Sequence, residues 1–140
     1  MPSRQQAQPD GYLSYERAWR MYCAFTRGRA DLPALRHALH SLRYHSRGSV
    51  TARYLLAAVY SSDDTPFFDA RRATANFARC LRDGLPDAAW MLALDCTGRG
   101  ALPKDLPRRF RWLMRGGALG EVRCRFLAGL AVAAGRGVRA

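Results

Sequence analysis

Apolar residues recur at three- and four-residue steps along most of the chain, which is the spacing of one buried helix face. Ala88, Met91, Leu92 and Cys96 form one such set. The pattern also repeats, because shifting the sequence by 36 residues aligns residues of the same physical type, without a gap, from about residue 36 to residue 132. Segments with the alternating pattern of strands are nearly absent. The pattern therefore predicts an all-α repeat protein.

Each period predicts two helices. The first helix of the pair is expected at about residues 49–60, 86–96 and 121–133, and the second at about 32–45, 70–82 and 106–115. Asp69 and Asp105 precede second helices, where N-capping residues belong. Glycines follow the second helices as terminators, at Gly48, Gly84 and Gly120. One more first helix is expected at about residues 13–26, with a shorter loop behind it.

A helix pair of this kind cannot bury its apolar stripe alone, whereas stacked pairs bury a continuous core. We therefore expect a short right-handed α/α superhelix, or solenoid, of antiparallel helix pairs, with about three repeats and a terminal helix. The first helices would line a concave face and the second helices the outside. Residues 1–11 are expected to be a flexible tail. Residues 12–140 would be a single repeat domain, with units at about 12–48, 49–84 and 85–120 and a half unit at 121–140.

The charge balance narrows the class of partner. The 140 residues carry 23 basic and 11 acidic side chains, a formal net charge of +12, so acidic partners are attracted and basic ones repelled. No apolar run approaches the roughly 18–20 residues of a membrane span, and no secretory signal is visible, which favours a cytoplasmic protein. The four cysteines form no C-x-x-C pair, so they are expected to be reduced, small core residues.

Successive periods share a spaced set of small, aliphatic, acidic and basic residues. The set is Ala52, Leu56, Ala57, Tyr60, Asp69, Arg72, Ala73, Arg79 and Gly84 in one unit, and Ala88, Leu92, Ala93, Asp105, Arg108, Trp112, Arg115 and Gly120 in the next. In the last unit it is Gly129, Gly135, Gly137 and Val138. This set resembles the Sel-one-like repeats, relatives of the tetratricopeptide repeats. The resemblance implies a non-enzymatic adaptor, of the kind that serves bacterial signalling, envelope processes or host interaction.

The sequence also departs from that family. Gly116-Gly117 stands where the family has an Ala pair. A cysteine-rich branch of the family pairs two cysteines eight residues apart. Cys80 matches the first of those places, but its partner place is Ala88. Cys124 matches the second, but its partner place is Gly116. The disulfides of that branch are therefore not expected here.

Catalytic and metal-binding patterns are not supported. His37 and His40 are three residues apart and His45 is near, but no carboxylate or cysteine shares their face with metal-ligand spacing. The adjacent Asp63 and Asp64 are typical of turn and cap chemistry rather than acid–base catalysis. No nucleophilic triad or phosphate-binding loop has a suitable context. We expect no enzyme activity, no catalytic residue, no metal and no cofactor.

Apolar residues recur on the first helices, two places after the aligned small residues Ala52, Ala88 and Cys124 and again four places later. They are Tyr54, Ala58, Trp90, Leu94, Phe126 and Leu130. In the related tetratricopeptide groove this helix position faces the ligand, so these residues are predicted to line a partner-binding groove for a peptide or a partner helix. The alternative is that they pack between helices as core.

Arginines recur on the second helices. They are Arg36, Arg43, Arg72, Arg79, Arg108 and Arg115. The two members of each pair are seven residues apart, which is two turns along one face. This basic stripe is either a solvated surface, as is normal for the family, or a surface that binds nucleic acid or another anionic surface.

The helix expected at 121–133 carries apolar residues around much of its circumference, and they are Val122, Phe126, Leu127, Leu130 and Ala131. One face would pack on the helix at 106–115, and another would stay uncovered. A homodimer through this terminal helix would cover it. The net charge of +12 opposes such a pairing, and both alternatives remain open.

Overall fold

The computed structural model describes residues 11–97 and 103–136, which contain seven helices and no strand. The predicted all-α class is therefore confirmed. The chain divides into two compact units, Met1–Asp69 and Ala70–Ala140. The predicted tail at 1–11 lies outside the described residues except for Gly11, and so does the end of the predicted half unit, residues 137–140.

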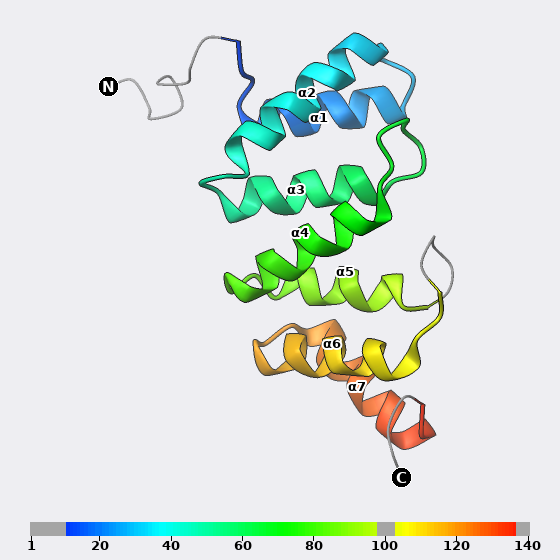
Figure 1. The fold of residues 1–140 in the computed structure, drawn as a ribbon. Coiled ribbons are helices and arrows are strands. Elements are labelled where there is room, and N and C mark those ends of the chain that lie inside the picture. The colour runs from blue at the N-terminus through cyan, green and yellow to red at the C-terminus, as the bar shows by residue number, and fades with distance from the viewer. Residues whose placement is uncertain (1–10, 98–102, 137–140) are drawn as a thin grey trace. The chain divides into compact units, whose positions relative to one another are not determined.

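The first unit contains three helices, α1 (Tyr15–Thr26), α2 (Leu32–His45) and α3 (Val50–Ser61) (Figure 1). Each starts at a capping side chain, which is Ser14, Asp31 or Ser49 and accepts a hydrogen bond from the backbone N–H three residues on. Helix α2 packs against both α1 and α3, and α1 also touches α3.

The second unit contains four helices, α4 (Ala70–Arg82), α5 (Asp87–Asp95), α6 (Leu106–Ala118) and α7 (Val122–Ala134). Each packs against the next, and α5 also touches α7. Phe77, Leu92 and Leu113 are the largest wholly buried side chains of this unit. Asp105 caps α6 as predicted, because its Oδ1 accepts from the Arg108 N–H at 3.0 Å.

The 36-residue period is visible in the backbone. The Leu85 N–H donates to the Cys80 carbonyl at 3.0 Å, and 36 residues later the Glu121 N–H donates to the Gly116 carbonyl at 2.9 Å. Between these partners Gly84 and Gly120 take left-handed conformations, with φ of 93° and 91°. Only glycine adopts this conformation without a steric penalty, so both glycines end their helices as predicted.

One predicted helix terminator and one predicted helix end differ from the structure. Gly48 does not take the left-handed conformation. Helix α2 ends at His45, and the turn behind it closes through the Gly48 N–H, which donates to the His45 carbonyl at 3.2 Å. Helix α6 continues to Ala118, three residues beyond the predicted end. Its Gly116 and Gly117 are buried, and tertiary packing there overrides the low helix propensity of a glycine pair.

Candidate interaction surface

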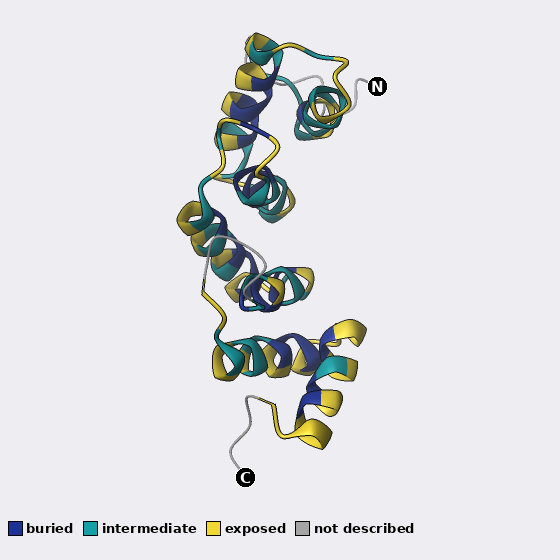
Figure 2. Ribbon diagram, turned by 90° about the vertical axis from the view of Figure 1, so that its right-hand side faces the viewer, coloured by how far each residue is buried: buried dark blue, intermediate teal, exposed yellow. Residues whose placement is uncertain are grey.

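The predicted apolar ladder lies on α3, α5 and α7. Tyr54 and Ala58, in the first unit, are half-buried. In the second unit Leu94 is 41% exposed, Phe126 65% and Leu130 50%. Because α5 and α7 touch each other, these three side chains stand on neighbouring helices. Figure 2 shows how much of the surface of α7 is exposed. This part of the ladder is an exposed apolar surface rather than core.

Trp90 differs from the other ladder residues of its unit. Its side chain is half-buried, and the guanidinium carbon of Arg123 lies 4.8 Å from the centre of its ring. This is the geometry of a cation–π contact. Trp90 therefore packs at the edge of the exposed surface, under an arginine that the sequence pattern did not single out.

Glu121 holds the start of α7 in place. Its Oε2 accepts from the Cys124 N–H at 2.6 Å, and its Oε1 accepts from Arg123 Nε at 2.6 Å. Burial raises the pKa of a carboxyl, but these hydrogen bonds outweigh it and keep the pKa of Glu121 below its ordinary value. Ser, Thr, Asp and Asn are the usual N-cap residues, so sequence rules do not point to Glu121 as a cap.

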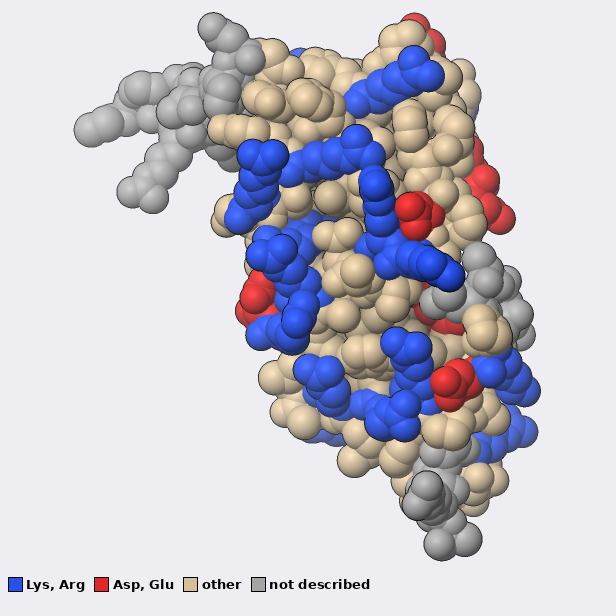
Figure 3. All heavy atoms as spheres, viewed as in Figure 1, with Lys and Arg blue, Asp and Glu red and all other residues tan. Residues whose placement is uncertain are grey.

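The six arginines of the basic stripe are all exposed. Two of them also contact aromatic rings. Arg43 Nε donates to the Tyr60 hydroxyl at 2.9 Å, and the Arg115 guanidinium carbon lies 5.3 Å from the centre of the Trp112 ring. Helices α4 and α6 each contain four arginines and no acidic residue. Figure 3 shows basic side chains on the drawn face, with few acidic ones beside them.

The three histidines fix the segment before α1 against α2. His37 Nε2 lies 2.7 Å from the Gly11 carbonyl, and His45 Nε2 lies 2.8 Å from the Leu13 carbonyl. The His40 ring stacks on Tyr12 with centroids 4.9 Å apart. Sequence analysis assigned these side chains no role. The structure gives them an anchoring one.

Cys80, Cys96 and Cys124 are buried and Cys23 is half-buried, so three of the four thiols occupy the predicted core places. None of the four forms a disulfide bond. Burial raises the pKa of the Cys124 thiol to about 12, which leaves it protonated and unreactive at neutral pH.

Asp95 occupies a position that is apolar in the neighbouring periods. Val59 and Ala131, 36 residues before and after it, are buried. Asp95 itself is half-buried at the last residue of α5, beside a small hollow that Asp105 and Arg108 also line. Burial raises the pKa of Asp95 to about 6. Sequence analysis did not single out this residue, although a carboxylate within an apolar repeat position was a usable signal.

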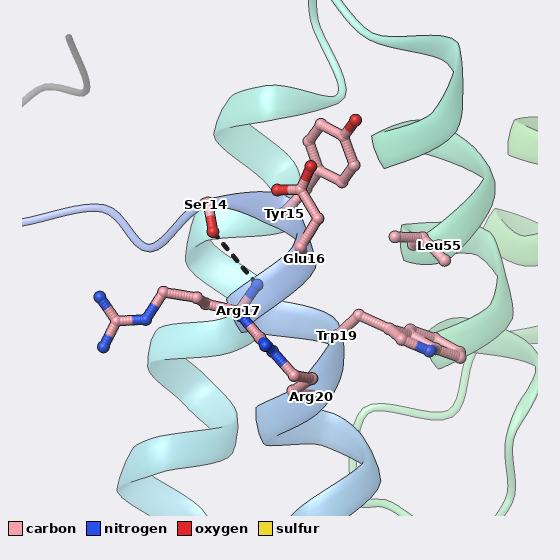
Figure 4. A pocket seen from close by; sticks show the side chains of 7 residues that line it. All are labelled: Ser14, Tyr15, Glu16, Arg17, Trp19, Arg20 and Leu55. Carbon is pink, nitrogen blue, oxygen red and sulfur yellow. Dashed lines mark hydrogen bonds between the residues drawn. The ribbon is translucent and has the colours of Figure 1, made fainter. Parts of the chain in front are cut away.

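An open hollow of about 680 Å³ lies beside the start of α1 (Figure 4). It is lined by Ser14, Tyr15, Glu16, Arg17, Trp19, Arg20 and Leu55. Figure 4 shows these side chains around the first turns of α1, with Leu55 contributed by α3. Its charged side chains are of both signs, with Glu16 beside Arg17 and Arg20.

A second hollow, of about 400 Å³, lies between α6 and α7. We call it the α6–α7 hollow. It is lined by Leu113, Met114, Gly117, Ala118, Arg125, Ala128, Gly129 and Val132. The sequence pattern predicts an uncovered face on the terminal helix, but at other residues than those that line this hollow. Of the predicted residues, Val122, Phe126 and Leu130 are exposed but stand on a different face of α7.

No protein-family model matches the sequence, and a comparison with curated proteins finds no match. Within residues 11–97 and 103–136, no helix is long and apolar enough to cross a membrane. The same residues contain no group of three or more His, Cys, Asp or Glu side chains placed to hold a metal ion. Support for an interaction site therefore comes from the geometry and exposure of these surfaces alone.

Proposed function

We propose that the protein is a non-enzymatic interaction scaffold built like the Sel-one-like and tetratricopeptide repeats, as a right-handed superhelix of antiparallel helix pairs. Its ladder residues would bind a peptide or a partner helix in a concave groove. The observation that carries this proposal is the exposed apolar surface of Leu94, Phe126 and Leu130 on the neighbouring helices α5 and α7. Contiguous exposed apolar side chains typically mark an interaction site.

Phe126 is the anchor to test, because it is the most exposed ladder residue at 65%. Aromatic anchors commonly cost at least about 2 kcal/mol of binding energy when they are truncated. A photo-crosslinking phenylalanine analogue at position 126 should therefore capture a partner in cells. The same analogue at Thr26, an exposed position at the end of α1 outside both candidate surfaces, is the control for random capture.

Phe126→Ala should weaken binding of the captured partner by about thirtyfold or more, and leave the melting temperature nearly unchanged because the side chain is exposed. Trp90→Ala is expected to lower both the affinity for the partner and the melting temperature, since Trp90 is half-buried beneath Arg123. Equal capture at positions 126 and 26, or unchanged binding by Phe126→Ala, would count against the groove.

The second candidate function is binding of nucleic acid or another anionic surface by the basic stripe. It is supported by the exposure of all six stripe arginines and by the absence of any acidic residue from α4 and α6. Contacts of arginine with phosphate release counterions, so affinity for nucleic acid would fall steeply with salt.

Charge reversal tests this candidate. Changing Arg72, Arg79, Arg108 and Arg115 to Glu should leave the helical content unchanged, because the four side chains are exposed. If the stripe binds phosphates, an electrophoretic shift of RNA or DNA seen with the wild type at about 150 mM salt should be lost. A wild-type protein that produces no shift at that salt concentration argues for a merely solvated stripe.

A further inference from the structure

The α6–α7 hollow is the place where a further helix would pack if the repeat continued. One period earlier, the same positions are covered by α6. Ala89, Ala93 and Cys96 are 0%, 2% and 6% exposed there. Helices α5 and α6 approach each other closely there, because a Cβ built on Gly116 of α6 would lie 2.7 Å from the Ala89 Cβ of α5.

In the last period the corresponding positions are open. Cys96 corresponds to Val132, which is 56% exposed, and Ala93 corresponds to Gly129, which is also exposed. On α6 the neighbouring Met114 is 51% exposed. Two helices thus present an apolar, helix-shaped seat that no helix among residues 11–97 and 103–136 covers.

The charge at this seat defines its occupant. Arg125 stands 36 residues after Ala89, at the equivalent position of the next period. It lines the hollow, and its guanidinium donates to the Gly117 carbonyl at 3.0 Å. Arg111 lies one turn before Met114 on the same side of α6. Helices α6 and α7 together carry six arginines and no acidic residue. The two flanking carboxylates, Asp105 and Glu121, are already bound as helix caps.

We propose that the α6–α7 hollow binds an amphipathic helix of a partner protein, with an apolar stripe that packs on Met114, Gly129 and Val132 and a carboxylate that pairs with Arg125. A helix as basic as α6 does not suit this seat, although it packs on the equivalent positions one period earlier. An acidic flank satisfies the arginine side chains that would otherwise face an uncharged or basic surface. The site is separate from the groove proposed above.

A second copy of the chain fits the seat poorly. Residues 70–140 contain 14 basic and 5 acidic side chains, a net charge of +9, so two such units repel each other. Helices α2, α4, α6 and α7 contain no acidic residue at all. Charge complementarity therefore favours a different, acidic chain over a homodimer.

The probe is a synthetic peptide based on α6, the helix that fills the equivalent seat. It covers residues 105–120 with Arg108→Glu, Arg109→Glu, Arg111→Glu and Arg115→Glu, and a hydrocarbon staple holds it helical. A fluorescent label allows binding to the whole protein to be followed by anisotropy at about 150 mM salt, where long-range attraction between exposed charges is largely screened. A scrambled, stapled peptide of the same composition controls for attraction by net charge.

Two variants of equal charge locate the site. Val132→Glu places a carboxylate in the hollow, whereas Phe126→Glu places one on the ladder face of the same helix. Both positions are more than half exposed, so both variants should fold, which circular dichroism checks. The acidic peptide should bind the wild type and Phe126→Glu alike and bind Val132→Glu at least about tenfold more weakly.

Four outcomes would overturn the proposal. They are no binding by the acidic peptide, equal binding by the scrambled peptide, equal weakening by the two Glu variants, and loss of binding in Phe126→Glu alone. The last outcome would assign the peptide to the groove instead. Light scattering of the free protein supplies a further test, because a dimer that Val132→Glu dissociates would show that a second copy fills the seat.

Discussion

Gly116→Ala should destabilise the protein by about 2 kcal/mol, although alanine is normally the better helix residue. A Cβ at position 116 would lie 2.6 Å from Cys124 Sγ and 2.7 Å from the Ala89 Cβ. Both neighbours are wholly buried, so neither can move away without disturbing α5 or α7. Forcing a methyl group into such a core typically costs about 1–3 kcal/mol. Urea denaturation of the two proteins measures the difference.

Gly129→Ala is the matched control, since Gly129 is also inside a helix, but a Cβ built there meets nothing within 4 Å. This variant should gain about 0.5–1 kcal/mol, the ordinary benefit of alanine over glycine in a helix. The two substitutions are chemically identical, but they should change the free energy of unfolding in opposite directions. A gain in Gly116→Ala would mean that α6 and α7 are not packed as closely as the structure has them.

The pair Gly116 and Cys124 explains one departure from the repeat pattern. One period earlier the same positions are Cys80 and Ala88, so the larger and the smaller side chain have changed places. The later pair is also one methyl group smaller, and Cys124 Sγ occupies part of the space that a Cβ at position 116 would need. Adding Cys124→Ala to Gly116→Ala should therefore recover part of the lost stability. The contact with Ala89 remains, so recovery should be incomplete.

The helical repeat could be predicted from the sequence because its signals are local. Spacing, caps and terminating glycines fix the helices, and α2 and α4 have the predicted limits. The prediction was wrong at the end of α6, because the burial of Gly116 and Gly117 is a tertiary effect that helix propensity does not contain. The prediction of Gly48 as a terminating glycine was wrong because Gly48 does not take the left-handed conformation, although α2 ends at His45 as predicted.

The candidate surfaces were less predictable. The period identifies which positions are equivalent, but exposure depends on what packs against each one. Trp90 and Phe126 are equivalent in sequence, yet Trp90 lies half-buried under Arg123 while Phe126 is 65% exposed. The α6–α7 hollow was missed for the same reason, because Gly129 and Val132 correspond to core residues of the preceding period.

The stability of the wild type should contain a pH-dependent contribution from Asp95. Burial raises the pKa of this carboxyl to about 6, from an ordinary value of 3.8. Between these two values the folded protein keeps the proton and the unfolded chain releases it. The contribution of Asp95 to the free energy of unfolding therefore falls as the pH rises from about 4 to about 6, and stays low above that. A shift of this size corresponds to at most about 3 kcal/mol.

Asp95→Asn removes the charge and keeps the shape, so this variant should be more stable than the wild type by up to about 3 kcal/mol at pH 7.5 and nearly equal to it at pH 4. The measurement is urea denaturation of both proteins across that pH range, plotted as the difference between them. Asp87→Asn is the control on the same helix, because Asp87 is exposed in the first turn of α5, where a negative charge is favourable. It should leave stability at pH 7.5 unchanged or slightly reduced. A difference between Asp95→Asn and the wild type that does not vary with pH would show that Asp95 is ionised and solvated in the folded protein.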